Sequence, residues 1–321
     1  MSLSRGAARA LETGRWDGLV ARAIASAFAP VAARGIVRQA TVPQGIALVC
    51  VGGATLGGSG KTRVAIACAR ELAAAGARVA LVGHAYRADP TRARVVVEGD
   101  RVDEVGDEAL VCARALARWA VPIVVGPTRQ AAIDRALLLD PVPEVLVLDG
   151  PLALRGSPAR SLSLLAVDAH RPWGVGRLPP AGDLRAPRDV LLSRADHVVP
   201  VDATPAVVRW RAGEGPSLAE LRSTSVGLFT AIARPDRLVR ALASVGVHPR
   251  AIVSVADHGA GASVGPLLRG AEVDAWLATA KCALHLADVP LRVPLGVVDA
   301  EPPLPSGVLA ALRALRRSSF E

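Results

Sequence analysis

Short apolar segments alternate with helix-like segments through much of the chain. The apolar segments are rich in valine, leucine and isoleucine and lack a polar face, which is typical of strands buried on both sides. They lie at 45–51, 78–82, 121–126, 144–148, 164–168 and 195–201. Because helix-like segments separate most of them, the pattern predicts an α/β fold with a mostly parallel sheet flanked by helices.

A polar, proline-dotted stretch separates this region from a second group of elements. Beyond it, strand-like segments at 226–231 and 251–255 flank a helix-like segment that ends before Gly246, a natural helix C-cap. The pattern therefore predicts a linker at 206–225 and a second, smaller α/β domain at 226–321.

Residues 1–40 carry arginines and apolar side chains at helical spacing. The apolar side chains are Leu11, Trp16, Val20, Ile24, Phe28 and Val31, and the arginines are Arg5, Arg9, Arg15, Arg22, Arg34 and Arg38. Such a segment suits an anionic membrane surface, where apolar groups enter the interface and arginines meet head groups. It equally suits a helix packed on its own domain. The sequence predicts an N-terminal amphipathic helical segment at 1–40 and leaves both roles open.

The first apolar segment runs into a glycine-rich loop that precedes a helix-like segment. The loop reads Thr55-Leu56-Gly57-Gly58-Ser59-Gly60-Lys61-Thr62. Glycines let the backbone turn its N–H groups toward phosphate oxygens, and a helix start adds partial positive charge. Lys61 would reach the outer phosphates of a nucleotide, and Thr62 would hold Mg²⁺ through its hydroxyl. The common pattern has glycine where Thr55 stands, and an ordinary glycine-rich turn is the alternative interpretation.

This order of strand, loop and helix predicts a P-loop NTPase-like, nucleotide-binding core at 41–205. Nucleotide phosphates are expected to contact Thr55, Gly57, Gly58, Ser59, Gly60, Lys61 and Thr62. The use of lysine supports this expectation, because Lys61 and Lys281 are the only lysines among 38 basic residues. A compact ammonium on a flexible stem suits this phosphate position better than a planar guanidinium does.

Composition limits the partners of the chain. A formal charge of +9 and an isoelectric point near 10.7 favour an anionic partner, although a genomic preference for arginine would give the same charge. Nucleic acid is disfavoured because aromatic residues make up only 3% of the chain and no basic cluster is interleaved with them. The four cysteines lack metal-ligand spacing and predict buried, reduced thiols. No apolar run reaches the length of a membrane span.

Three carboxylates stand where a phosphate site would use them. Asp107 and Glu108 open a helix-like apolar run, where acidic residues also serve simply as partners of the helix dipole. Asp149 ends an apolar strand, which is where a P-loop protein supplies its second magnesium contact. An ordinary turn aspartate before Gly150 is the alternative interpretation of Asp149.

The order of these motifs resembles the tetraacyldisaccharide 4'-kinase family, also called lipid A 4'-kinase. The family's phosphate loop, G-N-L-T-V-G-G-T-G-K-T, corresponds to 52–62 and accounts for Thr55. Further matches are V-G-D-E at 105–108, G-N-G-R-L-L-P-A-G-P-L-R-E-P at 174–187, A-x-A-R-P-x-R-F at 231–238, D-H at Asp257-His258 and T-E-K-D-A-V-x-L at 279–286. The resemblance covers almost the whole chain in the right order.

This resemblance implies transfer of the ATP γ-phosphate to the 4'-hydroxyl of an acylated glucosamine disaccharide lipid, with ATP and Mg²⁺ as cofactors. It implies that the catalytic residues are His258, Asp107 and Lys61, with His258 and Asp107 as the acid–base pair. The implied metal ligands are Thr62, Asp149 and Glu108. It further implies a peripheral enzyme on the cytoplasmic side of the inner membrane, at an anionic membrane surface. No nucleic-acid partner is expected, and no protein partner is identified.

Three motifs depart from the family pattern. The family's S-R-G-Y is Gly83-His84-Ala85-Tyr86, which lacks the arginine, and the glutamate and aspartate of T-E-K-D are Ala280 and Cys282. The family's strand-end sequence D-D-G-x-Q-H has Leu148, Leu152 and Ala153 in place of its first aspartate, its glutamine and its histidine. Loss of a carboxylate would slow phosphoryl transfer, which depends on positioning and charge neutralisation, unless Asp103 or Glu108 takes over the role. The alternatives are a scaffold that binds nucleotide or lipid without catalysis, and a P-loop NTPase acting on another partner.

Overall fold

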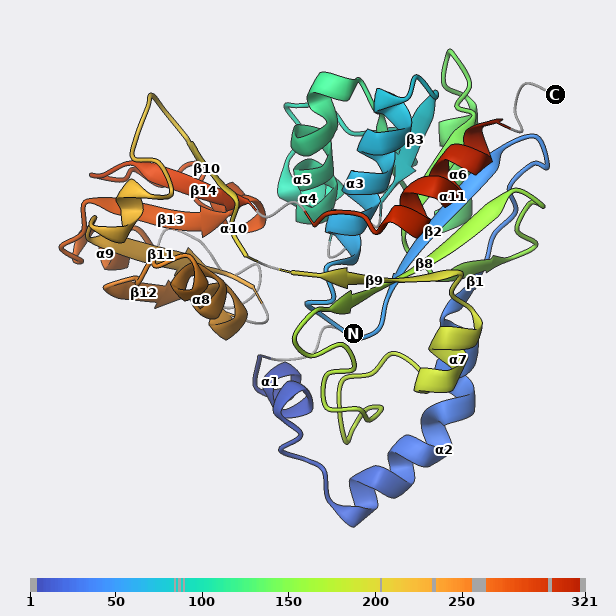
Figure 1. The fold of residues 1–321 in the computed structure, drawn as a ribbon, viewed down its shortest axis with the longest axis horizontal. Helices are drawn as coiled ribbons and strands as arrows, with labels where there is room; N and C mark the ends of the chain where they lie inside the picture. The colour runs from blue at the N-terminus through green and yellow to red at the C-terminus, as the bar shows by residue number, and fades with distance from the viewer. Residues whose placement is uncertain are drawn as a thin grey trace. The chain divides into compact units, whose positions relative to one another are not determined.

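The computed structural model describes residues 5–83, 85, 88, 90–202, 204–232, 235–255, 264–299 and 302–317. The chain forms two compact units (Figure 1). The larger unit comprises residues 9–201 and 302–321, and the smaller unit comprises residues 1–8 and 202–301.

The larger unit is built on a seven-stranded sheet with the order β4-β5-β3-β6-β2-β8-β9. Its strands are β2 (Ala47–Gly53), β3 (Val79–Val82), β4 (Arg94–Val95), β5 (Ile123–Val125), β6 (Val145–Gly150), β8 (Ser161–Asp168) and β9 (His197–Val201). All neighbouring strands pair in parallel except β4, which runs antiparallel to β5 at one edge. Every residue of β2 and β3 is buried, as expected for a sheet covered on both faces. The predicted parallel α/β fold is confirmed.

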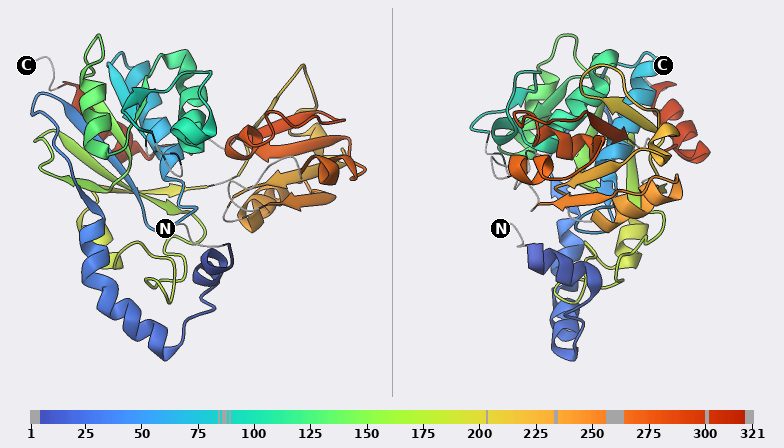
Figure 2. Two further views of the ribbon diagram at one scale, coloured as in Figure 1. Left: turned by 180° about the vertical axis from the view of Figure 1, so that it is seen from behind. Right: turned by 90° about the vertical axis from the view of Figure 1, so that its left-hand side faces the viewer.

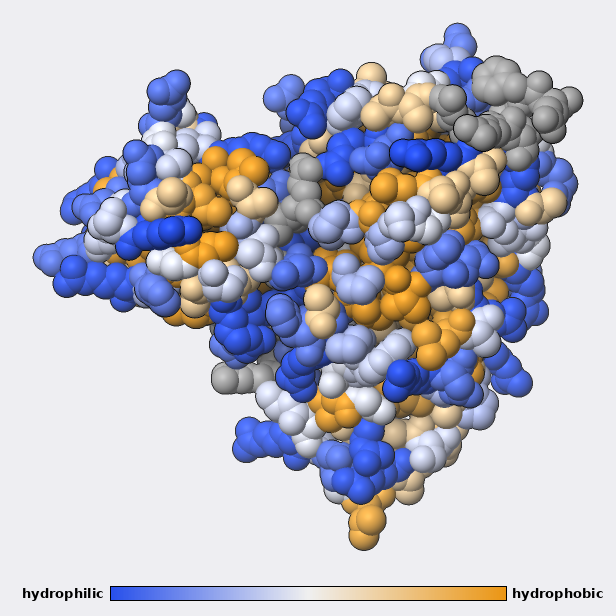
Figure 3. Space-filling model, viewed as in Figure 1, coloured by the Kyte–Doolittle hydropathy of each residue, from blue (hydrophilic) through white to orange (hydrophobic). Residues whose placement is uncertain are grey.

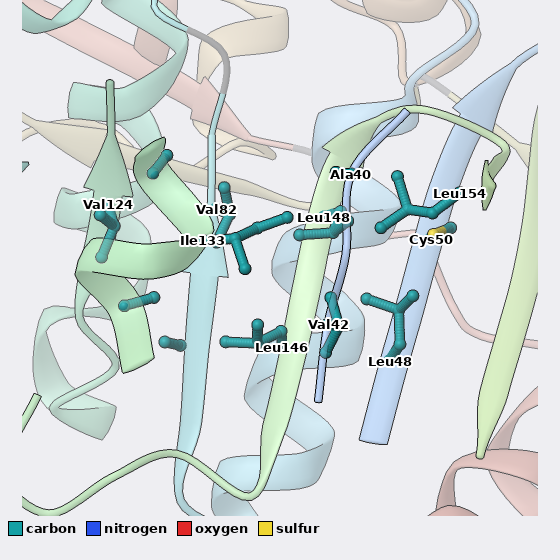
Figure 4. Packing of buried hydrophobic residues seen from close by; sticks show 13 residues of the cluster. Ala40, Val42, Leu48, Cys50, Val82, Val124, Ile133, Leu146, Leu148 and Leu154 are labelled. Atoms are coloured by element: carbon teal, nitrogen blue, oxygen red, sulfur yellow. The ribbon is translucent and has the colours of Figure 1, made fainter. Parts of the chain in front are cut away.

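Helices cover this sheet on both faces (Figures 1 and 2). They are α3 (Lys61–Ala74), α4 (Val102–Val105), α5 (Asp107–Leu116), η1 (Ala117–Trp119), α6 (Arg129–Leu137), α7 (Arg188–Ser193) and α11 (Ser306–Arg317). On one face, Ile133 of α6 joins a buried cluster with Leu146 and Leu148 of β6 (Figure 4). Helix α3 packs against β2 and β6 and also contacts α5. This arrangement brings the starts of α3 and α5 to the ends of the central strands.

Two helices and a short strand precede the central strand. They are α1 (Arg5–Thr13), α2 (Leu19–Gly35) and β1 (Val37–Gln39), and β1 pairs in parallel with β7 (Ala153–Arg155). Helix α2 extends away from the sheet (Figures 1 and 2). One side of α2 is buried, because Ala25 and Ala32 join a cluster with Leu165 of β8. Helix α2 is therefore anchored to its own domain on that side.

The smaller unit holds a five-stranded sheet with the order β10-β14-β13-β11-β12. Its elements are β10 (Val207–Trp210), η2 (Glu220–Arg222), β11 (Val226–Thr230), α8 (Pro235–Ser244), β12 (Ala251–Ser254), α9 (Val264–Arg269), β13 (Ala275–Thr279), α10 (Ala280–Leu284) and β14 (Leu295–Asp299). Strand β10 pairs antiparallel with β14, and the other neighbouring strands pair in parallel. The apolar side chains of β11 and β13 form the centre of this unit's core.

The structure places two segments in other parts of the fold than the sequence pattern predicted. Strand β10 lies inside the expected linker at 206–225, because Val208 and Trp210 pack against the core of the smaller unit. Helix α11 lies inside the expected C-terminal domain at 226–321 but belongs to the larger unit, where it contacts α3 and buries Val308 and Leu312.

All four cysteines are free and buried. Burial raises the pKa of the Cys50 and Cys68 thiols to about 12, so both stay protonated at neutral pH. In the part of the chain that the structure describes, no three His, Cys, Asp or Glu side chains are grouped so that they could hold a metal ion by themselves. The same part contains no helix with the length and apolar character that crossing a membrane requires.

Candidate nucleotide-binding site

The loop between β2 and α3 depends on its glycines. Gly60 caps the start of α3 with φ +80°, and a Cβ added there would lie 2.5 Å from Val201 Cγ1. A Cβ added at Gly53 would lie 2.1 Å from Ser59 Oγ. Thr55 is 1% exposed, and its hydroxyl donates a hydrogen bond of 2.7 Å to the carbonyl of Gly57. Thr55 therefore closes the loop from inside, at the position where the common pattern has glycine.

Lys61, Thr62, Asp149 and Glu108 come together at the start of α3. Lys61 Nζ lies 3.1 Å from Oε2 of Glu108 and 3.3 Å from Oδ1 of Asp149. The hydroxyl of Thr62 donates a hydrogen bond of 2.7 Å to Oδ2 of Asp149. Three elements that are distant in sequence, α3, α5 and β6, thus supply one cluster of a cation, a hydroxyl and two carboxylates.

Electrostatics keep Lys61 charged in this cluster. Burial would lower the pKa of the ammonium, but the carboxylates of Asp149 and Glu108 outweigh burial, and the pKa of Lys61 is raised. An ammonium held between two carboxylates is poised to exchange them for the oxygens of a phosphate.

Asp149 is held at its main chain as well as at its side chain. Arg129, in the first turn of α6, donates a hydrogen bond of 3.1 Å from Nη2 to the carbonyl of Asp149. Burial lowers the pKa of Arg129, and the charge of Asp149 opposes that effect. The following residue, Gly150, has φ +120°, so the chain turns sharply just after the aspartate. Arg129 therefore fixes the end of β6, a role that its place near a helix start did not reveal.

Of the two carboxylates considered as replacements at Leu148, the structure places Glu108 beside Lys61. Asp103 instead pairs with Arg101 at 3.1 Å, and both side chains are more than two-thirds exposed. Leu148 itself is fully buried in the cluster against α6, so an apolar side chain suits that position. Leu152 is also buried, and a Cβ added at Gly52 would lie 2.8 Å from its Cβ. These two departures from the family motif are core residues here.

Of the two residues expected to form an acid–base pair, one lies in the part of the chain that the structure describes. Asp107 begins α5 and is fully buried, directly before Glu108. His258 lies outside the described residues.

The long loop, residues 174–187, contacts the phosphate loop directly. Leu56 N donates to the carbonyl of Asp183 at 2.8 Å, and Arg185 N donates to the carbonyl of Ala54 at 2.9 Å. These bonds flank an antiparallel bridge between Thr55 and Leu184.

The side chain of Arg185 reinforces this bridge. Its Nε donates to the carbonyl of Thr55 at 2.8 Å, and its Nη2 lies 3.4 Å from the carbonyl of Leu56. Its charge is close enough to act on the pKa of Lys61 in the downward direction. Sequence reasoning did not single out Arg185, although the arginine belongs to the long-loop motif that carries the family resemblance.

In this parallel sheet, the central strand β2 leads through a glycine loop into a helix that starts Lys-Thr. The neighbouring strand β6 carries an aspartate at its end. Together these features define a P-loop nucleotide-binding protein. Comparison with known proteins narrows this class. The family model for tetraacyldisaccharide-1-P 4'-kinase, LpxK, matches residues 18–287. The chain belongs to this family, as its motifs indicated.

Individual relatives agree with the family model. The chain is 32% identical over 311 residues to the tetraacyldisaccharide 4'-kinase of Paramagnetospirillum magneticum, covering 89% of this chain and 92% of the relative. It is 33% identical over 279 residues to the tetraacyldisaccharide 4'-kinase of Azorhizobium caulinodans, covering 80% of each. The crystal structure of LpxK from Aquifex aeolicus, in complex with ATP, has the same fold, with a TM-score of 0.68 at 20% identity over 94% of this chain and 96% of that one.

Proposed function

We propose that this protein transfers the γ-phosphate of ATP to the 4'-hydroxyl of tetraacyldisaccharide 1-phosphate, a step of lipid A biosynthesis. The observation that carries the proposal is the cluster of Lys61, Thr62, Asp149 and Glu108 in a chain of the tetraacyldisaccharide 4'-kinase family. Phosphoryl transfer needs little covalent chemistry from a protein, and it depends on positioning and charge neutralisation, which this cluster supplies.

The phosphate loop and Lys61 bind the ATP phosphates, and Lys61 exchanges its carboxylate partners for phosphate oxygens. The donor set suits Mg²⁺, because that ion prefers oxygen ligands, and the Thr62 hydroxyl and the Asp149 carboxylate lie 2.7 Å apart. Thr62, Asp149 and Glu108 would hold Mg²⁺, which would neutralise phosphate charge during transfer. Arg129 keeps Asp149 in place through its carbonyl.

Asp107 and His258 form the proposed acid–base pair of the reaction. A sugar hydroxyl is a weak nucleophile, and a histidine oriented by a carboxylate can take its proton as the phosphate is transferred. Support comes from the family resemblance of both motifs and from the full burial of Asp107, which leaves its carboxylate little freedom to move.

A nucleotide-binding scaffold without catalysis is the second candidate function. Leu148 favours it, because a carboxylate of the family motif is missing there. The contact between Glu108 and Lys61 weighs against it, since Glu108 supplies a second carboxylate beside Asp149 at the phosphate site.

The test is a direct assay of the purified full-length protein with ATP, Mg²⁺ and tetraacyldisaccharide 1-phosphate in detergent or vesicles. The expected product carries a second phosphate, at the 4'-position, and its formation requires the lipid. Tight ATP binding without this product would select the scaffold. Equal ATP hydrolysis with and without lipid would point to another P-loop NTPase.

The exposed side of α2 is proposed to rest on the anionic surface of the inner membrane, on its cytoplasmic side. Its large apolar side chains are exposed: Leu19 by 84%, Val20 by 75%, Ile24 by 52%, Phe28 by 41% and Val31 by 56%. Figure 3 shows apolar surface at the tip of this helix, at the bottom of the view. Burying such side chains in a membrane interface is favourable, and it brings the enzyme to a lipid substrate.

The substitution Ile24→Asp is expected to weaken binding to anionic vesicles about tenfold, because it removes an apolar side chain from the interface and adds a charge. Val97→Asp is the matched control, since Val97 is 54% exposed elsewhere on the larger unit. Vesicle co-sedimentation measures both affinities. Equal loss in the two variants would contradict a specific role for α2.

A further inference from the structure

The long loop, besides its contact with the phosphate loop, has a second attachment near the N-terminal helices. Arg177 Nε lies 3.0 Å from Oδ1 and 3.1 Å from Oδ2 of Asp17, which stands in the turn between α1 and α2. The same carboxylate accepts two hydrogen bonds from Arg22 of α2, at 2.8 and 2.9 Å. The two segments also pack closely, because a Cβ added at Gly14 would lie 2.9 Å from Val175 Cγ1.

Between these two attachments, hydrogen bonds form within the long loop. Val175 N donates to Oδ1 of Asp183 at 2.9 Å, and Leu184 N donates to the carbonyl of Arg177 at 2.9 Å. Asp183 is 1% exposed. The backbone at Gly174 passes close to this carboxylate, because a Cβ added at Gly174 would lie 2.1 Å from Oδ1 of Asp183. The long loop is therefore compact and held by its own contacts, and Arg177 is hydrogen-bonded directly to Leu184 within it.

These contacts form one continuous path. The Asp17 carboxylate holds the Arg177 side chain, the Arg177 carbonyl holds Leu184 N–H, and Leu184 bridges Thr55 of the phosphate loop. We propose that the long loop couples the N-terminal helices to the phosphate loop, so that membrane contact at the helices and nucleotide binding at the loop change each other's affinity. This coupling rests on the proposed function, which supplies a membrane surface at α2 and ATP at the phosphate loop.

The expected strength of the coupling follows from the solvent exposure of the Arg177–Asp17 ion pair. The side chains of Arg177 and Asp17 are 44% and 23% exposed, and ion pairs near the surface contribute modestly. Loss of this pair is expected to change the coupling about two- to fivefold.

The experiment uses the full-length protein, a fluorescent ATP analogue, and vesicles of phosphatidylethanolamine and phosphatidylglycerol. The dissociation constant of the analogue is measured with and without saturating vesicles. In the wild type the two values are expected to differ about two- to fivefold, and saturating analogue should change vesicle affinity by the same factor, because linkage is reciprocal. Arg177→Gln should bring this ratio close to one.

Arg78→Gln is the matched control. It removes the same charge from another partly exposed ion pair of the larger unit, Arg78–Glu144 at 2.9 Å, and leaves the contacts of Asp17 and the long loop in place, so the ratio should stay at the wild-type value. A wild-type ratio of one with both ligands bound, or the same ratio in Arg177→Gln and wild type, would overturn the coupling alone. Failure of the wild type to bind the analogue or the vesicles would overturn that part of the proposed function, and the coupling with it.

Discussion

Replacing Lys61 with methionine is expected to lower kcat/KM for phosphoryl transfer to the lipid about 10²- to 10³-fold, the range seen when one charge-stabilising donor is removed from an active site. The ammonium lies 3.1 Å from Glu108 and 3.3 Å from Asp149, at the position where the outer phosphates of ATP would bind. Affinity for an ATP analogue should fall as well. Steady-state kinetics with varied lipid and equilibrium binding of the analogue measure the two effects.

Lys61→Arg serves as the control for charge. It keeps the positive charge but replaces a compact ammonium with a planar, bulkier guanidinium, so it should restore only a small part of the activity. Thermal unfolding of all three proteins checks that the fold is intact. Wild-type kcat/KM in Lys61→Met would rule out the proposed role of the phosphate loop.

The phosphate loop could be predicted because its determinants are contiguous: a buried strand, a run of glycines and a helix start follow one another in the chain. Asp149 could be placed at the same site because the carboxyl ends of parallel strands share one edge of the sheet. Both inferences use only local pattern and the general geometry of parallel sheets.

The choice between Asp103 and Glu108 could not be made from the sequence. The two residues are only five positions apart, but Gly106, with φ +85°, breaks the chain into α4 and α5 between them. That break directs Glu108 to Lys61, whereas Asp103 stays exposed beside Arg101. The outcome depends on the angle between two short helices, which residue pattern does not encode.

Strand β10 escaped prediction for a different reason, the distance to its partner. It is short, the stretch around it looks like a polar linker, and its pairing strand β14 lies far along the chain, as the Arg209–Asp299 ion pair across 90 positions shows. The role of Arg185 could not be predicted because its partners are backbone carbonyls of the phosphate loop, 129 and 130 positions away. Contacts of this kind depend on how the chain folds back on itself.

Asp149→Asn is expected to lower kcat about 10²- to 10³-fold and to raise the Mg²⁺ concentration needed for half-maximal activity. Asparagine keeps the shape of the side chain, and its amide oxygen can still accept the hydrogen bond from Thr62. The change therefore removes the negative charge and little else. That charge is 1% exposed and contacts both Lys61 and Thr62, so water cannot replace it. Activity measured over a series of Mg²⁺ concentrations reports both effects.

Glu108→Gln makes the same chemical change at the other carboxylate, and a smaller loss of kcat is expected there. The side chain of Glu108 is 25% exposed and contacts Lys61, so solvent and Asp149 compensate for part of its charge. Because both carboxylates contact the same ammonium, the losses in the double variant should not add. A larger loss in Glu108→Gln than in Asp149→Asn would instead make Glu108 the principal carboxylate. The substitution at Leu148 would then have moved the main metal-side charge from the sheet to α5.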